Sequence, residues 1–308
     1  MGDKGEEDME QLDMDRGQIL RRIGWALFLM VLCNIAAQVI LSSLFYAYFP
    51  NFYQSEYYGV VLTMLTVMGV GYPVFLTVIR RVPDTKLSQE GPAKLTIRQF
   101  IGLFFVSVAF MYLSSLAGSI IGLLIARMKG SEMENPVAEF LDNSNLYLNA
   151  IYIAIIGPIM EEYIFRKILL NKLRRFGDLP AILFTSIAFG MYHLNLSQFI
   201  YATTLGIIFS YTVIRTNTIK YSVLIHMMIN AIGSLLVPLS LENVNAMLLL
   251  SLWVIVSVVI GLTIFQKSKR GILLQAGEEQ VERKTEYFLH FGTLLYLLSC
   301  AAMMLLQL

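Results

Sequence analysis

Long apolar stretches without charge constrain this chain more than any other feature of its sequence. Eight such stretches alternate with short charged segments. Each is roughly 18 to 36 residues long, and about 18 apolar residues suffice to cross a bilayer as a helix. Only 15% of the 308 residues are charged, whereas 56% are hydrophobic. The pattern predicts an all-α, polytopic transmembrane helix bundle with about eight or nine spans, and it excludes a soluble enzyme, a nucleic-acid-binding protein and a disordered chain.

The longest uncharged run, 179–214, exceeds the length of one helix, and we divide it at the polar tetrapeptide 195–198. Because the first 22 residues are polar and the first apolar stretch is too long for a signal peptide, that stretch is expected to stay in the membrane. The sequence thus predicts a cytoplasmic N-terminal tail, 1–22, and a single transmembrane domain, 23–308. The nine expected spans are 23–48, 57–79, 99–126, 144–165, 180–195, 198–214, 220–240, 244–266 and 287–308.

The basic residues predict how these spans are oriented. With nine spans, 21 of the 23 Lys and Arg residues fall on one side of the membrane. Lys and Arg are enriched in cytoplasmic loops, so we expect a multi-pass protein of the cell membrane with a cytoplasmic N-terminus and an external C-terminus. The other side receives only Arg127 and Lys129, at the start of the longest external connection, 127–145, whose role the sequence leaves open.

Ionisable residues within the spans are few, and they are costly, at roughly 2.5–3.5 kcal/mol for a central Asp, Lys or Arg. Glu161, Glu162 and Arg166 end the fourth expected span, one turn after Gly157-Pro158. Glu162 and Arg166 are four residues apart, which favours an ion pair. Glu161 projects about 100° away on the helix, so we expect it to be the freer carboxylate, in a separate environment.

Two further spans contribute His193 and the pair His226 and Asn230, which are four residues apart. Each residue alone also suits a structural role, as a mark of the cytoplasmic helix end or as an interhelical hydrogen bond worth about 0.6 kcal/mol. Together, five polar residues on three spans within 70 residues predict one polar pocket. Helix rise places Glu161 and His226 ~9 Å and His193 ~22 Å from the cytoplasmic side. We therefore expect span five to begin above the membrane surface or to be strongly tilted.

Such a pocket has the groups that peptide-bond hydrolysis needs. A carboxylate beside a histidine deprotonates water, and a second histidine with an amide offers two donors to a developing oxyanion. The sequence has no G-x-S-x-G turn or catalytic cysteine, so an acyl-enzyme has little support. The alternative is a zinc site on Glu161, His193 and His226. The missing H-E-x-x-H pattern favours a reaction without a metal or other cofactor.

Three motifs in this order, Glu-Glu-x-x-x-Arg (161–166), Phe-x-x-x-His (189–193) and His-x-x-x-Asn (226–230), resemble the CAAX protease and bacteriocin-processing (CPBP/Abi) family. This family includes the type II CAAX prenyl endopeptidases. The resemblance covers about 145–235 and implies an intramembrane endopeptidase acting on a membrane-embedded or lipid-anchored peptide or protein. It also implies the roles: Glu161 and His193 activate water, His226 and Asn230 stabilise the oxyanion, and Glu162, Arg166 and Phe189 are supporting residues.

Two other classes of function fit the same sequence. A non-catalytic membrane immunity or regulatory protein keeps the polar cluster without using it for cleavage. An ion-coupled transporter also places carboxylates and histidines within its spans. Transporters usually contain repeats and paired broken helices, whereas this sequence has one Gly-Pro break and no internal repeat. We therefore rank the transporter lowest. Nothing in the sequence points to recognition of a prenyl group.

Overall fold

A computed structural model describes residues 14–85, 93–130, 145–277 and 290–306 of the chain. Within these ranges the secondary structure is helical, apart from one isolated bridge between Gly177 and Ala276. Seven helices in the described residues are long and apolar enough to cross a membrane. The predicted all-α, multi-pass architecture is confirmed.

Every predicted span overlaps a helix or a continuous series of helical segments. The first part of the chain contains α2 (Arg16–Tyr48), α3 (Pro50–Tyr53), α4 (Tyr58–Thr66), η1 (Val67–Gly71), α5 (Tyr72–Ile79) and α6 (Ile97–Lys129). The central span consists of α8 (Leu146–Ile151), η2 (Tyr152–Ile156), α9 (Gly157–Glu161), η3 (Glu162–Leu170), α10 (Asn171–Leu173) and η4 (Arg174–Phe176). The remaining elements are α11 (Asp178–Tyr192), α12 (Leu196–Thr216), α13 (Lys220–Ala231), η5 (Ile232–Leu236), α14 (Val237–Leu241), α15 (Val244–Ser268), η6 (Lys269–Gly271) and α16 (Phe291–Leu306).

The predicted break between spans five and six is present. Leu194 has a positive φ of 54°, and the Asn195 side chain caps α12 by accepting a hydrogen bond from the Gln198 amide at 3.1 Å. The helix before the break, α11, has only 15 residues, and α16 has 16. At 1.5 Å per residue, each is roughly 22–24 Å long, which is less than the ~30 Å hydrocarbon core.

The fourth span was predicted to end at residue 165, and this boundary is wrong. The helix continues through a cationic stretch to Phe176. Arg166 and Lys172 are buried, and Lys172 Nζ lies 2.8 Å from Asp84 Oδ1. Arg174 Nε lies 3.2 Å from Asp178 Oδ1. Charged residues are unfavourable in lipid, which is why the sequence predicts an end at residue 165, but contacts within the protein keep these charges in the helix.

The first helix also begins earlier than predicted, at Arg16 instead of residue 23. Asp15 and Gln18 form a capping box that starts it. The connection 127–145 lies mostly outside the described residues, as do the first residues of the ninth predicted span and its last two. Gly130, with φ of 71°, forms the C-cap of α6.

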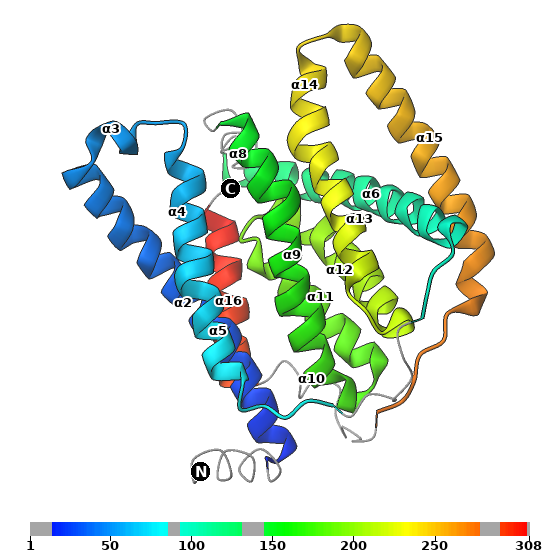
Figure 1. The fold of residues 1–308 in the computed structure, drawn as a ribbon, viewed down its shortest axis with the longest axis horizontal. Coiled ribbons are helices and arrows are strands. Elements are labelled where there is room, and N and C mark those ends of the chain that lie inside the picture. The colour runs from blue at the N-terminus through cyan, green and yellow to red at the C-terminus, as the bar shows by residue number, and fades with distance from the viewer. Residues whose placement is uncertain (1–13, 86–92, 131–144, 278–289, 307–308) are drawn as a thin grey trace.

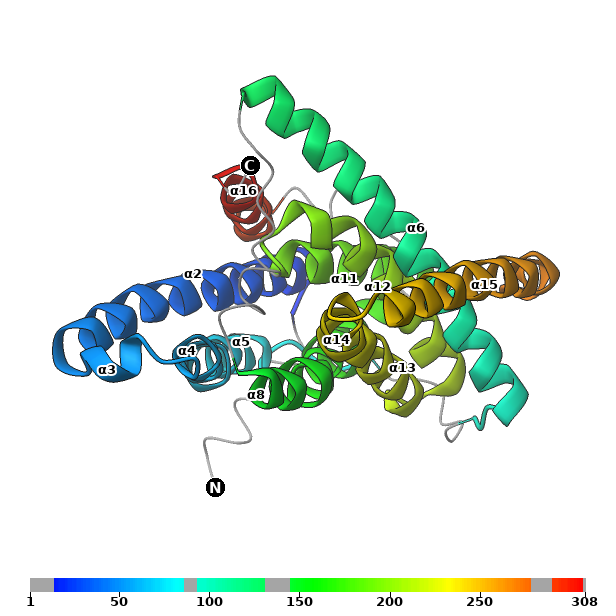
Figure 2. The same ribbon diagram turned by 90° about the horizontal axis from the view of Figure 1, so that it is seen from above.

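The helix from α8 to η4 stands in the middle of the molecule in Figure 1. On one side lie α2, α4, α5 and α16, and on the other lie α13, α14 and α15 (Figure 1). Helix α6 runs across the others instead of alongside them, and it packs on both α12 and α15 (Figures 1 and 2). Helices α11 and α12 pack on each other and on η3, and α13 packs on α9 and α12, which brings the segments that carry the candidate residues together.

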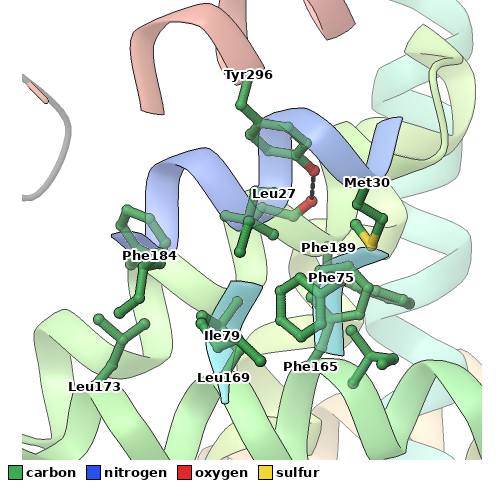
Figure 3. Packing of buried hydrophobic residues seen from close by; sticks show 14 of the residues in the cluster. Leu27, Met30, Phe75, Ile79, Phe165, Leu169, Leu173, Phe184, Phe189 and Tyr296 are labelled. Carbon is green, nitrogen blue, oxygen red and sulfur yellow. Dashed lines mark hydrogen bonds between the residues drawn. The ribbon is translucent and has the colours of Figure 1, made fainter. Parts of the chain in front are cut away.

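A cluster of buried hydrophobic side chains packs beside the segments that carry the candidate residues. Phe165 and Phe189 pack edge to face, with ring centroids 5.2 Å apart, next to Phe75 and Leu169 (Figure 3). The Tyr296 hydroxyl donates a 2.6 Å hydrogen bond to the Ala188 carbonyl (Figure 3). This bond ties α16 to α11 directly before Phe189, so the last helix helps to fix the residues that follow.

Candidate active site

The five polar residues that are predicted to form one pocket come from the central helix, from α11 and from α13. Glu161 ends α9 and Glu162 begins η3, while His193 is the C-cap of α11, and His226 and Asn230 lie on α13. Because the fourth span continues to Phe176, Glu161 lies about as far from that end as His193 lies from the start of α11. Gly177 joins these two helix ends, so Glu161 and His193 lie at similar depths, as they do if α11 begins beyond the membrane surface, which is one of the two expected arrangements.

His226 lies between the two glutamates. Its Nδ1 is 3.1 Å from Glu162 Oε1, and its Nε2 is 3.6 Å from Glu161 Oε2. The expectation that the two carboxylates occupy separate environments is therefore wrong. Their side chains do diverge, but one imidazole has a nitrogen on each side and bridges them. The Glu162 carboxylate only accepts hydrogen bonds, so His226 Nδ1 donates to it.

Glu162 and Arg166 form the predicted ion pair, with Oε1 and Nη1 3.0 Å apart and both side chains fully buried. The Arg166 guanidinium also lies over the Phe189 ring, 4.1 Å from its centroid, and 5.6 Å from the centroid of Phe209. Glu161 keeps 19% of its side chain exposed. Glu162 is thus held by Arg166, and Glu161 is the freer carboxylate, as predicted.

His193 is oriented by its own helix. Its Nδ1 lies 2.9 Å from the Phe189 carbonyl oxygen. A carbonyl is only an acceptor, so Nδ1 carries the proton, and Nε2 of the neutral ring has the free lone pair. The Phe189 ring packs edge to face on His193 at 4.9 Å and on His226 at 5.9 Å. Phe189 therefore separates and positions both imidazoles.

The Asn230 side chain binds a backbone carbonyl that Pro158 leaves without its helical partner. The Gly157 amide donates to the Tyr152 carbonyl, five residues earlier, which makes η2 a π-helical turn. Pro158 has no amide hydrogen for the next carbonyl, Ile153. Asn230 Nδ2 donates to that carbonyl at 2.9 Å. A primary amide has two N–H groups, so one remains for another acceptor.

Four tyrosines around Glu161 were not identified from the sequence. They come from four different segments and all lie within electrostatic reach of the Glu161 carboxylate: Tyr72, Tyr152, Tyr192 and Tyr201. The Tyr72 and Tyr192 rings stack with centroids 6.2 Å apart. With 16 tyrosines in the chain, only the position of Tyr192 next to His193 offered a signal. Phe209, 5.4 Å from His226, was also missed.

Metal binding was the alternative use of the same residues. Within the described part of the chain, no group of three or more His, Cys, Asp or Glu side chains is arranged to hold a metal ion. Of the three residues of the zinc alternative, His226 Nε2 and Glu161 Oε2 are 3.6 Å apart.

Comparison with known proteins supports the same segment of the chain. The family model for type II CAAX prenyl endopeptidase Rce1-like proteins matches residues 143–232, which include all three motifs. The putative membrane peptidase YdiL of Bacillus subtilis is 30% identical over 160 residues, which cover 51% of this chain and 64% of YdiL. The membrane-embedded CAAX protease MroQ of Staphylococcus aureus is 24% identical over 190 residues, which cover 57% of this chain and 75% of MroQ. No solved structure matches.

The chain is thus a multi-pass membrane protein that is similar to CAAX proteases over its central helices. The resemblance predicted from the three motifs is confirmed. The match to YdiL spans slightly less than two thirds of that relative, so the activity of the whole protein is treated below as a proposal.

Proposed function

We propose that this protein is an intramembrane endopeptidase that hydrolyses peptide bonds of a membrane-embedded or lipid-anchored protein or peptide, with a water molecule activated by Glu161. One observation supports this most strongly. The paired carboxylates, one partly exposed and one held by Arg166, lie on either side of His226, with His193 on a neighbouring helix. The similarity of 143–232 to the CAAX prenyl endopeptidases points to the same reaction class.

In the proposed reaction, Glu161 and His193 act on the water. His193 Nε2 has a free lone pair because Nδ1 donates to the Phe189 carbonyl, and the Glu161 carboxylate lies within its electrostatic reach. The water loses a proton to this pair while its oxygen attacks the carbonyl carbon of the scissile bond. When the tetrahedral intermediate collapses, the C–N bond breaks and the pair returns this proton to the leaving amine. A positioned general base of this kind contributes roughly 10²–10⁴-fold to the rate.

His226 and Asn230 are the proposed donors to the tetrahedral oxyanion. Asn230 has one N–H left after its bond to Ile153, and this bond fixes where the amide points. His226 donates Nδ1–H to Glu162, so it offers a second N–H from Nε2 only as an imidazolium. Glu162 and Arg166 therefore act through His226, by holding the imidazole between the two carboxylates.

The proposal is tested in cells by comparing membrane peptides between strains with the wild-type protein and with Glu161→Gln. We expect at least one peptide pair, the precursor and its product, to depend on the wild-type residue. Glu242→Gln, an exposed carboxylate after α14, is the matched control and is expected to behave as wild type. An unchanged peptide set and normal biological activity in Glu161→Gln would instead support a non-catalytic regulatory or immunity protein.

We further propose that the reaction requires no metal ion. This is supported over zinc by the absence, among the described residues, of any group of three or more His, Cys, Asp or Glu side chains arranged to hold a metal ion. Cleavage by the purified protein is expected to be insensitive to a chelator, and the zinc content is expected to be far below one per chain. Activity that is lost to the chelator and restored by zinc would establish the metalloprotease alternative.

The orientation is part of the same proposal. We propose that the N-terminus, the basic segment 166–175 and the connection between α12 and α13 face the cytoplasm and that the C-terminus lies outside, because Lys and Arg are enriched in cytoplasmic segments.

A further inference from the structure

A second polar pocket lies toward the end of the central helix, past Arg166. It has a volume of about 60 Å³, which is room for a phosphate-sized group or a few water molecules, since about 10–15 Å³ holds one water. The η3–α10–η4 segment forms one wall, and the connection between α12 and α13 forms the other. The polar lining residues are Arg166, Lys167, Asn171, Arg174, Asn217 and Thr218.

The charge in this pocket has one sign. Three of the lining residues are cationic, and no acidic residue lines it. The two nearest carboxylates are already engaged, since Glu162 pairs with Arg166 and Asp178 pairs with Arg174. Lys167 is exposed, and no salt bridge involves it among the described residues. The pocket is therefore suited to an anion.

Two buried polar groups along the wall lack partners. Arg166 is 1% exposed, and its Nε and Nη2 atoms have no hydrogen-bond partner, although Nη1 pairs with Glu162. The Asn171 side-chain oxygen is also buried without a partner, but it is an acceptor, so only the Arg166 donors favour an anion. A guanidinium has five N–H donors in a planar fork, a geometry that matches phosphate and carboxylate oxygens. The unused donors of Arg166 point to a polar ligand.

The surroundings of the pocket favour a lipid as the source of the anion. Lys167 continues a series of exposed residues at every fourth position of the central helix: Ile155 at 43%, Ile159 at 42% and Tyr163 at 43% exposure. These residues offer an apolar surface for acyl chains, and Tyr is favoured at the membrane–water interface. Basic pockets between transmembrane helices on the cytoplasmic side bind anionic headgroups.

We propose that this pocket binds the phosphate of an anionic phospholipid headgroup, with Lys167 and Arg174 at its rim and Arg166 at its inner wall. The acyl chains then lie along Tyr163, Ile159 and Ile155. The pocket does not include Glu161 or His193, the proposed water-activating residues. Arg166 belongs to both sites, because it lines the pocket and also pairs with Glu162. Its occupancy does not depend on whether the protein is a peptidase.

The test is native mass spectrometry of the purified full chain, delipidated and titrated with phosphatidylglycerol or phosphatidylcholine. We expect the protein to retain phosphatidylglycerol in preference to phosphatidylcholine. A basic residue near the headgroup is worth about 1 kcal/mol, so Lys167→Gln is expected to weaken phosphatidylglycerol binding about fivefold. Lys167→Arg keeps the charge and is expected to restore binding. Arg215→Gln, an exposed cation that does not line the pocket, is the matched control and is expected to bind as wild type.

Three results would overturn the proposal. Equal losses in Lys167→Gln and Arg215→Gln would show attraction to the general surface charge. Inorganic phosphate that binds with the same dependence on Lys167, without retention of phosphatidylglycerol, would show a site for the free anion. If binding of a peptide with a free carboxyl terminus depends on Lys167 and binding of the lipid does not, the pocket would be assigned to a peptide.

Discussion

His226 organises the candidate site because each of its ring nitrogens faces one of the two glutamates, while only Nδ1 is within hydrogen-bond distance. Nδ1 faces Glu162 at 3.1 Å, and Nε2 faces Glu161 at 3.6 Å. Arg166 Nη1 pairs with the same Glu162 oxygen, Oε1, at 3.0 Å. The pair of glutamates therefore divides into a structural carboxylate that orients the imidazole and a partly exposed carboxylate available to water.

Arg166→Met removes the partner of a fully buried carboxylate. Breaking such a pair is expected to cost about 3–5 kcal/mol, because Glu162 is left as an uncompensated buried charge. The double variant Glu162→Gln/Arg166→Met removes both charges and is expected to be more stable than Arg166→Met alone. Thermal unfolding of the purified protein in detergent measures both. Lys167→Met, at the exposed neighbouring position, is the control. A single variant as stable as the double variant would show that the pair is not electrostatically coupled.

At the scale of elements, prolines set the shape of the helices. Tyr72, Gly157 and Val237 each precede a proline, and each donates its amide hydrogen to a carbonyl five residues earlier. Each proline therefore follows a π-helical turn. Only at Pro158 does a side chain of the candidate site, Asn230, bind the carbonyl that the proline cannot satisfy.

Pro158→Ala restores an amide hydrogen that competes with Asn230 for the Ile153 carbonyl. We expect the protein to remain folded while Asn230 is released. The expected loss of peptidase activity approaches 10²-fold, the scale of a misplacement of about 1 Å in a catalytic site. Pro238→Ala, at the π-helical turn beyond the candidate site, is the control for both cleavage and thermal unfolding. Equal activities of the two variants would count against a role for the Pro158 turn.

The helices that the sequence predicts well are those where lipid and local capping decide the boundary. The break at Asn195 is an example, because the polar side chain caps α12. The sequence does not predict that the central helix continues to Phe176. The side chains that bury Arg166 and Lys172 are distant in the sequence or lie on other helices. The three motifs include the residues of the Glu162–Arg166 pair and of the bridge at His226, but the bridge itself and the tyrosines around Glu161 depend on how the helices pack.

At the scale of the whole molecule, the membrane orientation follows from the distribution of Lys and Arg. Single cysteines at Arg215 and Glu242, introduced after Cys33 and Cys300 are replaced by Ala, report the two sides. We expect a membrane-impermeant maleimide to label Glu242→Cys in intact cells and Arg215→Cys only after the membrane is opened, because Arg215 lies in a predicted cytoplasmic connection. The reverse pattern would invert the orientation.

The most direct measurement of the central claim uses purified protein reconstituted in liposomes, with a substrate peptide identified from the membrane-peptide comparison. Single-turnover cleavage is measured for the wild type, Glu161→Gln and Glu242→Gln. If Glu161 activates the attacking water, Glu161→Gln is expected to slow cleavage by about 10²-fold or more, while Glu242→Gln cleaves as wild type. Cleavage by Glu161→Gln at the wild-type rate would contradict the glutamate-activated mechanism.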